Sequence, residues 1–109
     1  MNLAIYMIKY WFEHGGICLW SANDNARNRF NYPIDNDKLP ISKKLIEELY
    51  ALEEEYHGYL DWDYPPNPSP WSLEQKNDFK NRANMAYLKL LSELGDEFEI
   101  INEIDKCVI

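Results

Sequence analysis

Apolar and polar positions alternate in part along residues 3–13, which are rich in Tyr, Ile, Trp and Phe. This period of two predicts a β-strand. A Gly15-Gly16 pair follows, and glycine tolerates the positive φ that tight turns require. Residues 17–20 then form a short apolar run, typical of a largely buried strand. The first 20 residues therefore predict a β-hairpin.

Two later segments carry the period of a helix. In residues 42–60, apolar side chains recur at the i, i+4, i+7 spacing of one buried stripe, and Ser42 is a plausible N-cap. A second helix is predicted from Ser72, with Gln75 at the capping-box position, to about Leu94.

The segment between these helices, residues 61–71, contains four prolines in six residues. Proline excludes both a continuous helix and a regular ladder, so we expect a stiff, extended loop. In one interpretation the loop is a rigid crossover whose Trp62 and Trp71 fill the core. In the other it is a preorganised loop that presents side chains to a partner, namely Asp61, Trp62, Asp63 and Tyr64. The two are compatible if Trp71 is buried and Tyr64 lies outside.

A short helix over residues 25–30, capped by Ser21 or Asn23, and a last strand over 97–102 complete the pattern. The predicted class is α+β, with two long helices packed on one face of a small antiparallel sheet. That sheet consists of the N-terminal hairpin and the C-terminal strand. The chain, residues 1–109, is short enough for a single domain.

The formal charge of −8 limits the choice of partners. Nucleic acid and anionic membranes are disfavoured, whereas a basic protein is favoured. No run approaches the roughly 20 apolar residues of a spanning helix. Without a secretory signal, we expect a cytoplasmic protein with reduced thiols at Cys18 and Cys107, and a structural, buried Cys18.

The acidity is confined to the second part of the chain. Residues 1–44 have a balance of +2 and residues 45–109 a balance of −10. The acids gather in two stretches, 47–63 and 93–105, which contain no Lys or Arg. Such acidic stretches are ordinarily explained as the solvent-exposed face of a helix or the edge of a strand. However, a purely structural helix gains from i, i+4 Lys partners, which the first stretch lacks, so a surface for a basic partner is indicated.

Catalytic and metal-binding motifs are not evident. His14 and His57 have no zinc-site spacing, and we expect no metal, no cofactor and no enzyme activity. A small carboxylate-based hydrolase remains an alternative, and it requires a pocket with two converging acids.

Several short motifs resemble those of a family of small, acidic bacterial proteins. They are residues 19–24 (LWSAND), Ala26-Arg27, Arg29-Phe30, Tyr32-Pro33, Leu39-Pro40, Ser42, residues 60–63 (LDWD) and residues 68–72 (PSPWS). In size and acidity this family is similar to the immunity proteins of bacterial toxin systems, including contact-dependent growth inhibition. The resemblance implies a cytosolic protein that neutralises an incoming toxin domain, and it supplies no catalytic residue.

We therefore expect an immunity-type protein that binds a cognate basic toxin domain, in particular a nuclease. The expected contact residues combine acids with aromatic side chains: Glu53, Glu54, Asp61, Trp62, Asp63 and Tyr64. An acidic adaptor or regulatory domain for another cellular protein is the alternative outside the toxin systems.

Overall fold

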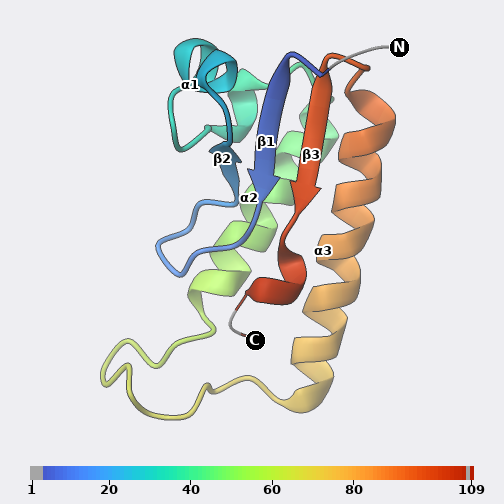
Figure 1. Ribbon diagram of the computed structural model, residues 1–109. Helices are drawn as coiled ribbons and strands as arrows, with labels where there is room; N and C mark the ends of the chain where they lie inside the picture. The colour runs from blue at the N-terminus through green and yellow to red at the C-terminus, as the bar shows by residue number, and fades with distance from the viewer. Residues whose placement is uncertain (1–3, 108) are drawn as a thin grey trace.

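The computed structural model describes residues 4–107 and 109. The elements follow in the order β1 (Tyr6–Tyr10), β2 (Leu19–Ser21), α1 (Asp24–Phe30), η1 (Asn36–Lys38), α2 (Lys43–His57), α3 (Leu73–Glu93), β3 (Phe98–Asn102) and η2 (Ile104–Lys106). The long helix α2 passes behind the sheet, and α3 runs beside β3 (Figure 1). The α+β class is confirmed.

The hairpin is present, with β1 antiparallel to β2. Its turn closes where the Gly16 N–H donates to the Glu13 carbonyl at 3.0 Å, and Gly16 has the positive φ of 101° that glycine permits. Regular strand geometry is shorter than predicted and ends at Tyr10. Residue 3, the expected start, lies outside the described residues.

Both long helices form where their apolar periods predict them. The stripe of α2 is buried at Leu45, Leu49, Leu52 and Tyr56. The corresponding positions of α3 are Phe79, Ala83, Ala86 and Leu90. Each helix begins at its predicted serine cap, since Ser42 accepts from Leu45 N–H at 3.2 Å and Ser72 from Gln75 N–H at 3.1 Å.

The prediction of a wholly antiparallel sheet is wrong for the last strand. The strand order is β2-β1-β3, and β3 pairs with β1 in parallel. The reason lies in α3, whose 21 residues return the chain to the end of the sheet where β1 begins. There Glu93, at the end of α3, accepts from the Ser42 hydroxyl at 2.9 Å, and the Ile5 N–H donates to the Glu97 carbonyl.

The core between the sheet and the helices is largely aromatic. Phe12 packs against Tyr10, Tyr56 and Phe79, with ring centroids 5.2 Å apart for Phe12 and Phe79. The Tyr10 hydroxyl donates to the Ala83 carbonyl at 3.0 Å, so its burial leaves no unpaired hydroxyl.

Candidate partner-binding surface

The loop from α2 to α3 projects beyond the end of the sheet (Figure 1). Its base is anchored in the core by Trp71, which is 7% exposed and packs against Tyr59 and Phe79 at centroid distances of 5.4 and 5.2 Å. The Ser69 hydroxyl donates to the Tyr59 carbonyl and accepts from the Trp71 N–H at 3.2 Å. The structural interpretation therefore holds for Trp71.

Asp61 organises the outer part of this loop. One carboxylate oxygen accepts from the Asp63 N–H at 3.1 Å, and the other accepts from the Asn67 side-chain amide at 3.0 Å. These hydrogen bonds, that of Asn67 first, lower the pKa of Asp61. The carboxylate thus fixes the turn that presents Trp62, Asp63 and Tyr64.

Trp62 is held against the last residue of α2. Its ring stacks on His57 with centroids 4.5 Å apart and an interplanar angle of 17°. The Trp62 Nε1–H donates to the His57 carbonyl at 2.5 Å, and His57 Nδ1 lies 2.9 Å from the His14 carbonyl. The sequence does not predict this role of His57, because no periodic pattern encodes the loop conformation that brings Trp62 back onto the helix.

Most of the predicted contact residues lie on one exposed surface, which we call the tip surface: Glu54, Asp61, Trp62, Asp63 and Tyr64. Trp62 is 49% and Tyr64 59% exposed. Glu54 is exposed one helical turn before His57, the residue on which Trp62 stacks. Within residues 4–107, no ion pair involves Glu54 or Asp63.

Glu53 does not reach this surface, because its side chain is buried at 7% exposure. One oxygen accepts from the Cys18 N–H at 2.9 Å, and the other accepts from the Asn36 amide at 3.1 Å. Burial raises the pKa of Glu53, although these hydrogen bonds oppose the shift. The residue joins α2 to η1 and to the start of β2, so we remove it from the expected contact set.

Two further acids of the first stretch are paired across the helices. Glu48 lies 2.9 Å from Lys89, and Glu55 lies 2.8 Å from Arg82. The bases that appeared to be missing from α2 are therefore supplied by α3. The acidity left for a partner is smaller than the sequence indicates, and apart from the exposed Glu47 on α2 the remaining acids of this stretch lie at the tip.

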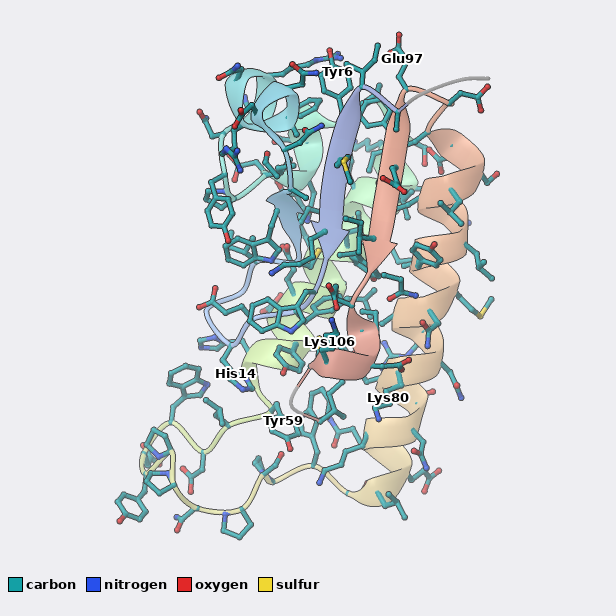
Figure 2. The ribbon with its side chains drawn as sticks, viewed as in Figure 1. Tyr6, His14, Tyr59, Lys80, Glu97 and Lys106 are labelled. Carbon is teal, nitrogen blue, oxygen red and sulfur yellow. The ribbon has the colours of Figure 1, made fainter. Side chains whose placement is uncertain are left out.

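Under the tip surface, His14 is enclosed by aromatic rings. It stacks on Tyr56 and Tyr59 at centroid distances of 4.8 and 5.6 Å, and Figure 2 shows it beside Tyr59. Its Nδ1 atom is buried without a hydrogen-bond partner among the described residues. Burial lowers the pKa of His14, with a smaller opposing effect of Glu13, so the neutral ring is favoured.

Residues 6–103 match a protein family described as Serratia CdiI immunity protein-like. The chain belongs to this family. The match confirms the resemblance to immunity proteins of contact-dependent inhibition systems and spans the sheet, both long helices and the tip surface. Comparison with curated proteins finds no match.

Membership in the Serratia CdiI immunity protein-like family gives the chain an immunity-type function, in which a cognate toxin protein is the partner. Both cysteines are free, with Cys18 buried as expected and Cys107 half-buried. Among the described residues, no helix is long and apolar enough to cross a membrane. The same residues contain no group of three or more His, Cys, Asp and Glu side chains arranged to hold a metal ion.

Proposed function

We propose that this immunity-type protein neutralises a basic toxin domain of the nuclease class by docking the tip surface onto it. The observation that carries the proposal is the pair of exposed aromatic rings, Trp62 stacked on His57 and Tyr64 in the turn that Asp61 organises, together with the exposed carboxylates of Glu54 and Asp63. Binding a stiff loop costs little ordering entropy, because the loop is already in place.

The charge of the chain supports a basic partner. A formal charge of −8 raises the encounter rate with a positively charged domain. A nuclease must bind phosphates, and it does so with clustered Lys and Arg. Carboxylates presented at the tip compete for those side chains, so inhibition follows if the tip covers the phosphate-binding groove of the toxin.

The aromatic residues supply a different part of the binding energy. Tyr and Trp contribute large contact areas with few rotatable bonds, and they dominate binding energy at many interfaces. We expect Trp62 to act as the anchor, because its stack on His57 fixes its orientation before the partner arrives. The charges of Asp63 and Glu54 then set the orientation in which the toxin domain docks.

Co-expression with the cognate toxin domain, sought first in the neighbouring gene, tests the proposal. The wild-type chain is expected to restore growth and to block the nuclease activity of the purified toxin. Tyr64→Ala and Asp63→Lys are expected to weaken protection. Tyr32→Ala is the matched control, because Tyr32 is also exposed, at 51%, but packs beside Trp20 away from the tip.

Three outcomes contradict the proposal. Protection unchanged in both tip variants would place the contact elsewhere. A neighbouring toxin without nuclease activity would overturn the nuclease class. If the chain binds a housekeeping protein and protects from no toxin, the adaptor alternative is favoured.

A further inference from the structure

A second surface, remote from the tip, combines a free strand edge with a groove. β3 is the last strand in the order β2-β1-β3, and no strand of residues 4–107 pairs with its outer edge. The Tyr6 N–H donates to the Glu97 carbonyl at 2.8 Å, and the Glu103 N–H donates to the Tyr10 carbonyl at 2.9 Å. Alternation along a parallel ladder then directs the backbone N–H and C=O of Ile100 away from β1.

β3 lies beside the C-terminal half of α3 (Figure 1). Residues of both elements line a groove of about 960 Å³. Its apolar lining comes from Tyr87, Leu91 and Leu94 on the helix side and from Phe98 and Ile100 on the strand side. Leu91 is 45% exposed. Leu88, one helical turn earlier, is 61% exposed, although Ala86 two positions before it is buried. Apolar side chains exposed beside a free strand edge mark a contact site.

The polar groups at this groove are acidic. Asp96 and Glu99 line it, and Glu97 is exposed at the start of β3 with its side chain directed away from the sheet (Figure 2). The described groove lining contains no Lys or Arg. A second copy of this acidic chain would meet repulsion here, whereas a basic segment would be attracted.

The two faces of β3 indicate the pattern of the occupant. Glu99 faces outward beside Met7, while Phe98 and Ile100 face the apolar lining of α3. A strand added beside β3 would alternate in the same way. Its side chains on the helix side would meet Tyr87 and Leu91, and those on the outer side would meet Glu99.

From this geometry we infer that the groove binds an extended segment of the cognate toxin, with apolar and basic residues at alternate positions, as a fourth strand on β3. This inference rests on the proposed function for the nature of the partner. Main-chain hydrogen bonds from Ile100 supply affinity, and the apolar lining and the acids select the sequence.

Binding by the toxin domain is measured for two groove variants and their controls. Leu91→Lys and Glu99→Lys are expected to weaken binding by about tenfold each, as for truncation of a central contact. Met85→Lys controls for the first, because Met85 is 58% exposed on α3 but does not line the groove. Asp105→Lys controls for the second, since it reverses an exposed acid of the same stretch outside the groove.

Amide hydrogen exchange separates the two proposals. Toxin binding is expected to protect the Ile100 amide from exchange. If the toxin binds without protecting this amide, and the groove variants bind it as tightly as the wild type, the fourth strand is overturned while the immunity function stands. An eight-residue peptide of alternating Lys and Ile, with a Glu-Ile peptide as control, serves as a probe without the toxin. If the Lys peptide protects Ile100 but the toxin does not bind, the groove stands and the proposed function fails. If neither ligand protects it, the groove is overturned.

Discussion

The two acidic stretches of the chain have different fates in the fold. In residues 47–63, Glu48 and Glu55 pair with bases of α3 and Glu53 is buried, whereas Glu47 stays exposed on α2 and the other acids lie at the tip beside exposed rings. In residues 93–105, Asp96 and Glu99 line a groove at a strand edge, whereas Glu103 pairs with Lys106. The acids of two similar stretches thus have different roles. Some pair the helices or form a buried hydrogen-bonded link, and others lie at the tip or line the groove. The charge of a stretch therefore does not locate an interface by itself. The acids that are buried or paired within the fold must first be subtracted.

The sharpest contrast lies within one loop, between Trp71 and Trp62. Trp71→Ala is expected to lower the free energy of unfolding by about 3–5 kcal/mol, because it empties a site in the core. Trp62→Ala is expected to cost about 1 kcal/mol or less, since it loses only the stack on His57 and one exposed hydrogen bond to the His57 carbonyl. Urea unfolding measures both. Equal losses would contradict the division of the loop into an anchored base and an exposed tip.

The neighbouring residues Glu53 and Glu54 give the next largest contrast. Glu53→Ala leaves the Cys18 N–H and the Asn36 amide without their acceptor, so a loss of about 1–3 kcal/mol is expected. Glu54→Ala is an exposed change and is expected to stay within about 0.5 kcal/mol of the wild type. A reversed order in urea unfolding would show that Glu53 is not the residue that joins α2 to η1.

The pH dependence of stability sharpens the role of Glu53. Burial raises its pKa above the ordinary value of 4.5, so the folded protein holds the proton more tightly than the unfolded chain. The stabilising contribution of this group is then fully present below about 4.5 and is lost as pH rises through the folded pKa. Glu53→Gln does not titrate at this position. We therefore expect the stability of the wild type relative to Glu53→Gln to fall between pH 4 and pH 7, and a constant difference in urea unfolding across this range would contradict the account.

The cross-helix ion pairs are expected to have the smallest effect. Arg82 is partly exposed and lies 2.8 Å from Glu55, so Arg82→Ala is expected to cost about 0.5–1 kcal/mol and less at high salt. Lys44→Ala, an exposed change with no ion pair within residues 4–107, is the control. A loss as large as that of Glu53→Ala would mean that pairing, and not binding, accounts for the acids of α2.

The sequence was sufficient for the strands and α-helices, because helix periods, serine caps and the glycine turn are local signals, but it did not predict the short η1 and η2. The direction of β3 was not predictable in this way, since it depends on where α3 returns the chain. The partners of Glu48 and Glu55 lie 41 and 27 residues away, so spacing within α2 could not reveal them. The burial of Glu53 did have a signal, because position 53 lies four residues after Leu49 and three before Tyr56 on the buried stripe.

Among the predicted contact residues, the fold brings together Glu54 and the four loop residues, and their contact with a toxin remains a prediction. Their convergence depends on contacts that no linear pattern specifies, namely the Asp61 turn and the stack of Trp62 on His57. The proline content signalled a stiff loop, but only the structure shows which rings it buries and which it exposes.

The central claim is that the tip surface contacts the toxin. The most direct test is the dissociation constant of the cognate toxin domain for Trp62→Ala compared with Tyr32→Ala, after both variants are shown to fold. The account predicts binding weakened by about tenfold or more for Trp62→Ala and unchanged for Tyr32→Ala. Wild-type affinity in Trp62→Ala would contradict it.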